Sequence, residues 1–267
     1  MPVDLSRPYQ NSAGFYADYR YRISSTFGHL LAARLRLTGK EQLLDLGCGP
    51  GILAERLAPY AAQIAAVDPE PDMLTEGIRR CAAADVTNVR FVRADSHNLA
   101  PVTDLAPFRA VTIGQALHWM YPQDQVLERL TTLTDRTGAV VLVTPTAVTA
   151  PAPWWQDIDT LLETYLADIP QEAHPGNRTP PFDEILHQSA FCHIEELYFE
   201  YETQEQPNLT AALGMRYGIS WVFARLGNRR EALEAEARER LGWIDDLPPR
   251  QVRRRDSAIF GFRSHST

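Results

Sequence analysis

The chain has 267 residues, of which 45% are hydrophobic and 22% charged, and its formal net charge at pH 7 is −8. This length and composition indicate a globular protein that can bury a full core as one large domain or as a domain with a cap. The acidic balance argues against a nucleic-acid surface or an anionic membrane, because both favour basic patches. We therefore expect a small-molecule substrate, no nucleic acid and no membrane association.

The cysteines and histidines indicate neither a disulfide framework nor a metal site. Cys48, Cys81 and Cys192 are odd in number and form no C-x-x-C pair. Five scattered histidines lack the spacing of metal ligands: His29, His174, His187, His193 and His265. The first residues show no signal peptide, and no apolar run approaches the roughly 20 residues of a membrane span. We expect a reducing, cytoplasmic location.

Residues 9–36 carry aromatic and apolar side chains at helical spacing and predict two helices before the first strand. In this segment Tyr19 and Arg20 follow Tyr16 by three and four residues, which places them on one helix face. The simplest interpretation is that Tyr16 and Tyr19 pack this helix on the core.

A glycine-rich turn follows the first predicted strand. The apolar run Leu43 to Leu46, interrupted by Asp45, leads into Gly47-Cys48-Gly49-Pro50-Gly51 and then into a helical pattern. Glycines at such a turn allow positive φ and a close approach of a ligand to the backbone. Dinucleotide sites require G-x-G-x-x-G, but here Ile52 stands in the third glycine's place. No Gly-Lys-Ser/Thr of a phosphate loop is present either.

The next two predicted strands also end in polar residues. Asp68 ends the strand 63–68, 21 residues after Gly47, where a carboxylate can accept both hydroxyls of a ribose. Asp95 ends the strand 89–95 and is followed by Ser96. Acidic residues therefore stand at or near the ends of three consecutive predicted strands.

These segments resemble the motifs of class I S-adenosylmethionine-dependent methyltransferases. The resemblance implies that the glycine turn holds the aminocarboxypropyl part of the cofactor and that Asp45 suits its ammonium. It further implies that Met73 packs on the adenine and that the segment around Asp95 reads the adenine amino group. S-adenosylhomocysteine would be the product. The expected cofactor-binding residues are Tyr16, Asp45, Gly47, Gly49, Gly51, Asp68, Pro69, Met73, Asp95, Ser96 and Gln115.

The run from Phe15 to Arg20 resembles the family's Y-x-x-Y-R lid, which closes over the cofactor sulfonium and forms a pocket wall. Under this interpretation Tyr16 contacts the cofactor and Tyr19 takes part in catalysis. Arg20, together with Arg22 and Arg216, could pair with a substrate carboxylate or phosphate, although solvation at the surface is the better explanation for any one of them.

From residue 42 to residue 146, short apolar strands alternate with helical patterns, which predicts an α/β, doubly wound, Rossmann-like sheet with ligands beyond the strand carboxyl ends. The resemblance implies seven strands, parallel except for one. We expect them near 42–47, 63–68, 89–95, 109–115, 138–145, 192–203 and 254–263.

The fourth strand leads into Gln115-Ala116-Leu117-His118-Trp119. This loop resembles that of the branch that includes trans-aconitate methyltransferases and many biosynthetic enzymes acting on small molecules. It lacks the Asn/Asp/Ser-Pro-Pro-aromatic motif of enzymes that methylate bases or glutamine amides, so such substrates are disfavoured. His118 is suited to remove a proton from a hydroxyl, amine or acidic carbon, or it only shapes the pocket floor. Trp119 packs in the core or offers a π face to the cationic methyl group.

After residue 146 prolines punctuate the chain, and helical pieces at 154–169 and 208–242 suggest a cap. The triplet Arg253 to Arg255 is interpreted as an exposed strand edge. The expected domains are a helical lid at 1–40, a cofactor-binding core at 41–146, a cap segment at 147–181, completion of the core at 182–205 and 251–267, and a helical cap insertion at 206–250.

The function that follows is methyl transfer from S-adenosylmethionine to an O, N or C atom of a small, hydrophobic or aromatic molecule. The alternatives are a non-methylating protein on the same fold, such as a cyclase or a regulatory subunit, and a nicotinamide-dependent oxidoreductase. The oligomeric state and the acceptor atom stay open. The expected substrate-binding residues are Tyr19, Arg20, Trp119, Trp154, Met215 and Trp221.

Overall fold

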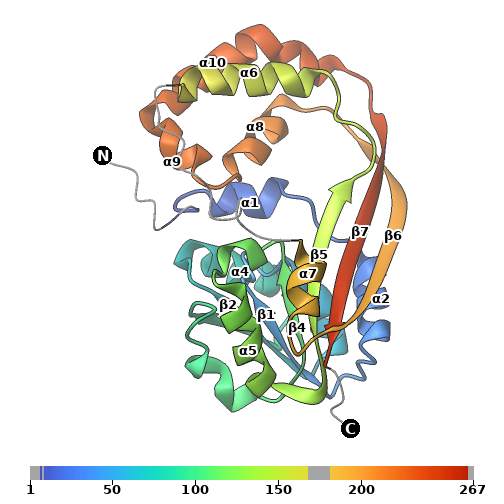
Figure 1. Cartoon of the computed structure of the whole chain (residues 1–267). Helices are drawn as coiled ribbons and strands as arrows, with labels where there is room; N and C mark the ends of the chain where they lie inside the picture. Colours follow the sequence, from blue (N-terminus) through green and yellow to red (C-terminus); the bar gives the residue numbers. More distant parts are fainter. Residues whose placement is uncertain (1–6, 8, 168–180, 264–267) are drawn as a thin grey trace. The chain divides into compact units, whose positions relative to one another are not determined.

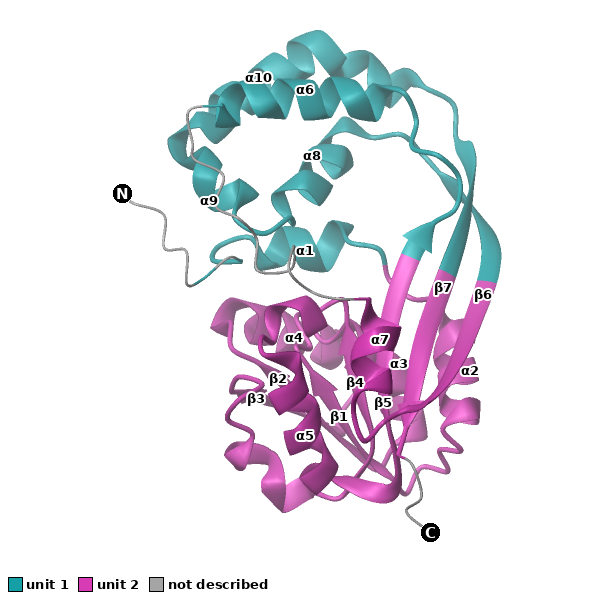
Figure 2. Ribbon diagram, viewed as in Figure 1, with its two compact units in different colours: residues 1–21, 146–172, 200–255 teal, residues 22–145, 173–199, 256–267 magenta. Residues whose placement is uncertain are grey.

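The computed structural model describes residue 7, residues 9–167 and residues 181–263. The chain forms two compact units, shown in different colours in Figure 2. The unit called here the sheet unit comprises residues 22–145, 173–199 and 256–267. The second, called the helical unit, comprises residues 1–21, 146–172 and 200–255.

A seven-stranded sheet has the strand order β3-β2-β1-β4-β5-β7-β6 (Figure 1). Its strands are β1 (Gln42–Leu46), β2 (Gln63–Asp68), β3 (Val89–Arg93), β4 (Phe108–Gly114), β5 (Thr134–Ala147), β6 (His193–Glu205) and β7 (Arg250–Phe262). The pairs β1–β2, β1–β4, β2–β3 and β4–β5 are all parallel. The carboxyl ends of these five strands therefore share one edge of the sheet.

Strand β7 runs antiparallel to β5. The Ser257 hydroxyl donates to the Thr144 carbonyl at 2.9 Å, and the Arg263 N–H donates to the Gly138 carbonyl at 3.3 Å. Partners thus move backwards along β5 as β7 advances, which is the antiparallel arrangement. The predicted Rossmann-like sheet with one antiparallel strand is confirmed.

The interpretation of Arg253 to Arg255 as an exposed edge is wrong. β7 lies between β5 and β6, so these arginines sit in the interior of the strand order. Arg254 pairs with Glu205, and Arg255 pairs with Glu200 at 2.5 Å. The acidic residues of β6 therefore explain the basic triplet as cross-strand partners.

Helices cover both faces of the sheet because its strands are apolar on both sides. Leu43 packs into a cluster with α2 (Ser25–Arg34) and α3 (Ile52–Leu57). Its neighbour Leu44 packs into a second cluster with α5 (Gln123–Leu133) and α7 (Phe182–His187). The helices of the sheet unit are α2 (Ser25–Arg34), α3 (Ile52–Leu57), η1 (Ala58–Tyr60), α4 (Pro71–Ala83), η2 (Ala100–Leu105), η3 (Leu117–Trp119), α5 (Gln123–Leu133) and α7 (Phe182–His187).

The helical unit has its own core, built on Trp154, Ile158, Tyr217 and Leu233. The Phe15 ring lies 5.2 Å from the ring of Tyr217, in an edge-on arrangement. Part of the aromatic content that suggested a ligand site therefore serves to hold this unit together. Its helices are α1 (Ala13–Tyr19), α6 (Trp154–Leu166), α8 (Leu209–Tyr217), α9 (Val222–Leu226), η5 (Gly227–Arg229), α10 (Arg230–Leu241) and η6 (Gly242–Asp246).

Several predicted boundaries shift. The third strand ends at Arg93, so Asp95 and Ser96 lie in the loop after β3. The expected lid over residues 1–40 is divided, because α1 belongs to the helical unit while Phe27 and Leu31 of α2 are buried in the core of the sheet unit. Only α1 is left as a candidate lid, and the predicted domain boundaries stay predictions. Within the described residues, no helix has the length and apolar character needed to cross a membrane.

Candidate active site

The three glycines after β1 all have left-handed backbone conformations. The φ angles are +67° at Gly47, +53° at Gly49 and +70° at Gly51. Side chains other than glycine rarely adopt such values, because Cβ then crowds the following carbonyl. The turn into α3 therefore requires glycine at each of these positions, as the sequence predicted.

The space around the glycines differs. A Cβ placed on Gly47 would lie 2.6 Å from Ala116 Cβ and 2.9 Å from Met120 Cε. At Gly49 the nearest atom would be Met73 Sδ at 4.0 Å. The turn thus packs tightly against the loop after β4 at Gly47 but stays open at Gly49, which is where a ligand could approach the backbone.

Asp45 is a buried carboxyl at the end of β1. Its side chain is 1% exposed, and Oδ1 accepts a hydrogen bond from the Thr112 hydroxyl at 2.8 Å. Register explains this contact, because Asp45 pairs with Thr112 across β1 and β4. Among the described residues, no group donates a hydrogen bond to Asp45 Oδ2. Burial raises the pKa of Asp45 to about 7, although the Thr112 hydroxyl and the nearby Ala54 N–H lower it.

Asp68 ends β2 and faces the same turn. Its Oδ2 accepts from the Gly49 N–H at 2.9 Å, and its Oδ1 accepts from the Glu70 N–H at 2.9 Å. Burial raises the pKa of Asp68 to about 6, while these two backbone bonds lower it. Each carboxylate oxygen can accept a second hydrogen bond, so Asp68 can order the glycine turn and bind a hydroxyl pair together.

The residues after β2 and β3 differ in accessibility. Met73 on α4 is buried at 2% exposure, whereas Pro69 is exposed. Asp95 is exposed, and its Oδ1 accepts from the His97 N–H at 2.7 Å, while the neighbouring Ser96 is buried. The structure brings Gly49, Asp68 and Met73 together, and it places Asp95 and Ser96 at the carboxyl end of the next strand.

The loop after β4 begins with a strained residue. Gln115 has φ of +51°, and its N–H donates to the Val143 carbonyl at 3.2 Å. Such conformations cost about 1–3 kcal/mol and cluster at functional sites. His118 and Trp119 follow in η3 with ring centroids 5.4 Å apart. Ala116 of this loop lies next to Gly47, so the loop is beside the glycine turn.

The remaining predicted residues belong to the helical unit. Tyr19, Trp154 and Met215 line one pocket of about 170 Å³, together with Tyr21 and Arg250. This pocket therefore brings together three of the expected substrate-binding residues from α1, α6 and α8.

Three further predicted residues stand outside the lining of this pocket. The Arg20 guanidinium lies 5.3 Å from the centre of the Tyr16 ring. Trp221 precedes α9 with φ of +62°. None of Tyr16, Arg20 and Trp221 is among the residues that line the pocket.

Arg216 is engaged within the protein. Its Nε and Nη2 donate to the two carboxylate oxygens of Asp159 at 2.5 and 2.8 Å, and its guanidinium lies 4.4 Å over the Trp155 ring. This double pairing makes Arg216 a link between α8 and α6. A role for Arg216 in binding a substrate anion is thus not supported.

Sequence reasoning missed two contributors to these sites. Thr112 is a polar residue in the otherwise apolar stretch from Ala110 to Ile113. Together with the register of β1 and β4, this polar residue in an apolar strand could have identified the partner of Asp45. Arg250 of the pocket lining carried no comparable signal. His174 and His265 lie outside the described residues, and among the described ones no cluster of three metal-ligating side chains occurs.

The family described as "Methyltransferase domain" matches residues 43–138. This range contains the glycine turn, both buried carboxylates and the loop of His118. Residues 43–138 are therefore similar to methyltransferase domains, in agreement with the resemblance in their motifs.

Curated relatives match part of this chain. Trans-aconitate 2-methyltransferase of Escherichia coli is 30% identical over 118 residues, which is 43% of this chain and 43% of the relative. An uncharacterised methyltransferase of Mycobacterium tuberculosis is 32% identical over 127 residues, covering 48% of this chain and 61% of the relative. The chain thus spans less than two thirds of the length of the curated relatives that it matches.

Solved structures share the fold of this chain. A putative type II methyltransferase from Anaeromyxobacter dehalogenans superimposes with a TM-score of 0.52 at 19% identity, covering 92% of this chain and 97% of that one. An S-adenosylmethionine-dependent methyltransferase from Thiobacillus denitrificans, solved with S-adenosyl-L-homocysteine, gives 0.50 at 13% identity, with coverages of 93% and 97%. These likenesses support the fold.

Proposed function

We propose that the protein transfers the methyl group of S-adenosylmethionine to a small, hydrophobic or aromatic molecule. The observation that carries this proposal is the open left-handed glycine turn between two buried carboxylates. Gly49 leaves space for a ligand at the backbone, and Asp45 and Asp68 flank it at the ends of adjacent strands.

The residues present fit this cofactor. Asp45 Oδ2 has no hydrogen-bonding partner among the described residues, and a buried carboxylate oxygen without a donor is costly. The ammonium of the cofactor would supply that donor. Asp68 retains acceptor capacity for two ribose hydroxyls, and Met73 offers a buried apolar side chain to the adenine. Asp95 and Ser96 would read the adenine amino group.

Methyl transfer is an in-line displacement at the sulfonium methyl group, so the protein contributes mainly by positioning the acceptor and excluding water. His118 is proposed to accept the acceptor's proton from an oxygen, nitrogen or acidic carbon. Tyr16 and Tyr19 of α1 are proposed as lid residues, by resemblance to the family's lid motif.

The pocket of the helical unit supports the acceptor class. Its aromatic lining includes Tyr19, Trp154 and Trp155, and it also contains Met215. A few polar groups in an apolar pocket are the usual composition for small-molecule recognition. Arg250 is a lining cation, and its Nη2 donates to the Ala150 carbonyl at 2.8 Å. This chemistry suits an aromatic acceptor better than a tricarboxylate such as the trans-aconitate named for the Escherichia coli relative.

The test has two steps. Calorimetry with S-adenosylmethionine and S-adenosylhomocysteine should show binding of both, and absence of both would end the proposal. Incubation with S-adenosylmethionine and a panel of aromatic acceptors should then give products heavier by one methyl group. Trans-aconitate belongs in the same panel, and methylation of trans-aconitate alone would overturn the proposed acceptor class. Cofactor binding without any methylated product across a broad panel would favour a non-methylating protein.

Gly214→Ala offers a matched probe of the acceptor pocket. A Cβ at position 214 would collide with the ring of Tyr19 and displace it. A Cβ at Gly242, also in the helical unit, would meet nothing within 4 Å. We expect Gly214→Ala to raise the KM for the acceptor while Gly242→Ala leaves it unchanged.

A further inference from the structure

The sheet unit contains a hollow of about 860 Å³, whose lining includes Arg34, Arg36, Arg109 and Arg263. Arg109 is the second residue of β4, and Arg263 follows the last residue of the antiparallel strand β7. Both therefore lie at the amino-terminal edge of the parallel strands. The glycine turn follows the carboxyl end of β1, so the hollow and the candidate cofactor site occupy opposite edges of the sheet.

The charges around the hollow do not cancel. Arg34 is balanced by Glu195, to which its Nε donates at 2.7 Å, and this guanidinium holds the pKa of Glu195 below its usual value. Arg109 lies 3.7 Å from Asp135. Among the described residues, Arg36 and Arg263 have no acidic partner within ion-pair distance. Two positive charges are therefore left over in a chain whose formal net charge is −8.

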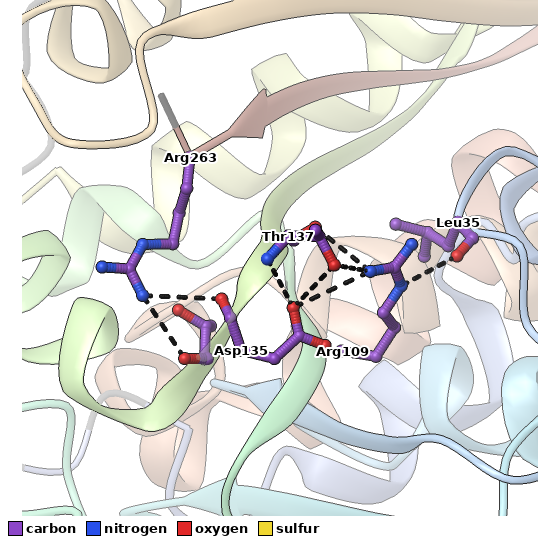
Figure 3. A network of polar contacts seen from close by, with 6 residues as sticks. Leu35, Arg109, Asp135, Thr137 and Arg263 are labelled. Atoms are coloured by element: carbon purple, nitrogen blue, oxygen red, sulfur yellow. Dashed lines mark hydrogen bonds and ion pairs between the residues drawn. The ribbon is translucent and has the colours of Figure 1, made fainter. Parts of the chain in front are cut away.

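Two of the arginines are held in place by one side of their guanidinium groups (Figure 3). Arg109 donates from Nε to the Leu35 carbonyl at 3.1 Å and from Nη1 to Thr137. Arg263 donates from Nη1 to the Thr131 carbonyl of α5 at 3.0 Å and, with longer bonds, to carbonyls at the start of β5. In both cases Nη2 donates no hydrogen bond to a described residue, so a fixed donor remains on each side chain.

A purely structural role explains only part of this arrangement. The bond of Arg263 to Thr131 satisfies a carbonyl near the carboxyl end of α5, and the bonds of Arg109 to Thr137 tie β4 to the start of β5. Neither purpose requires Arg36, which is exposed and makes no side-chain hydrogen bond to a described residue. Nor does it require the surplus of positive charge.

We propose that this hollow binds a small polyanion that carries two or more phosphate or carboxylate groups. Arg36 and Arg263 supply the uncompensated charge, and the Nη2 groups of Arg109 and Arg263 supply prepositioned donors. Guanidinium groups match the planar oxygen pairs of phosphate and carboxylate. The volume suits a small molecule, since ligand pockets commonly measure about 300–1,000 Å³. This site goes beyond the proposed methyl transfer.

Calorimetric titration of the whole protein with pyrophosphate and with citrate, at constant ionic strength, tests the proposal. At least one probe should bind, and the tighter of the two identifies phosphate or carboxylate as the preferred group. Arg36→Glu should weaken binding about tenfold or more, because it replaces a cation by an anion. Arg129→Glu is the control, since Arg129 is exposed on α5, outside the lining of the hollow, and the charge change is identical.

Each outcome decides the question. Absence of heat with both probes at millimolar concentration overturns the proposal, as does equal weakening by Arg36→Glu and Arg129→Glu, which would mean unspecific attraction. Saturation with S-adenosylhomocysteine should leave polyanion binding unchanged, and displacement would assign the probe to the cofactor site instead. Arg36→Gln, which removes the charge without adding a new one, should weaken binding less than Arg36→Glu and covers the case in which the glutamate variant does not fold.

Discussion

Replacing Asp45 by asparagine should make the free protein more stable and the cofactor complex weaker. Burial raises the pKa of Asp45 from 3.8 to about 7. The folded protein therefore binds the proton of the Asp45 carboxyl more tightly than the unfolded chain does. This protonation contributes its full stability below about pH 4, and the contribution is lost as the pH rises through about 7. A gap of about three pKa units corresponds to about 4 kcal/mol at pH 8. The asparagine side chain of the variant would stay neutral throughout and recover about 2–4 kcal/mol there.

The assay is urea unfolding of the free protein at pH 5 and pH 8, combined with calorimetry using S-adenosylhomocysteine. Asp45→Asn should raise the free energy of unfolding at pH 8 more than at pH 5. It should also weaken binding about tenfold to a hundredfold through loss of a charge-assisted hydrogen bond. Asp85→Asn, at an exposed position of the same unit, should change neither. Destabilisation of Asp45→Asn at both pH values with unchanged affinity would show that Asp45 serves only its bond to Thr112.

Other substitutions test the remaining parts of the site. Gly49→Ala should cost about 1–2 kcal/mol of stability but abolish S-adenosylhomocysteine binding. Gly47→Ala should lose more stability, because its Cβ would lie 2.6 Å from Ala116 Cβ. A smaller loss of stability for Gly47→Ala than for Gly49→Ala in urea unfolding would contradict this geometry. Asp68→Ala should weaken S-adenosylhomocysteine binding about tenfold to a hundredfold, and an unchanged dissociation constant in a folded variant would refute its role. Tyr19→Ala and Trp221→Ala should both lower turnover. The affinity of Trp221→Ala for S-adenosylhomocysteine should stay within about threefold of that of the unchanged protein. If Trp221→Ala is largely unfolded but its folded fraction has normal specific activity, Trp221 belongs to the core.

The glycine turn could be predicted because its signal is local. Three alternating glycines after an apolar run already require left-handed backbone, and the φ angles of Gly47, Gly49 and Gly51 agree. The partners of Asp45 and Asp68 could not be predicted in the same way. Thr112 reaches Asp45 only through the register of β1 and β4, which are 67 positions apart at this pair.

Long-range pairing also explains the errors. The arginines of β7 look like an exposed edge in isolation, and their partners Glu200 and Glu205 lie about 50 positions earlier in β6. Similarly, Arg216 stands among aromatic residues in the sequence, but Asp159 of another helix takes its guanidinium. Charge runs in a sequence therefore report on function only once the strand and helix neighbours are known. The roles of His118, Tyr16 and Tyr19 stay predictions for this reason.

The discontinuous composition of the helical unit has a consequence for synthesis on the ribosome. Its three segments are residues 1–21, 146–172 and 200–255. Helix α1 emerges first, yet its partner Tyr217 on α8 is made about 200 residues later. The apolar side of α1, including Phe15, therefore lacks its packing partners during most of translation. Strand β7 is needed by both units and emerges near the end. Loss of a few dozen carboxyl-terminal residues should thus prevent both units from completing their cores and leave an aggregation-prone chain.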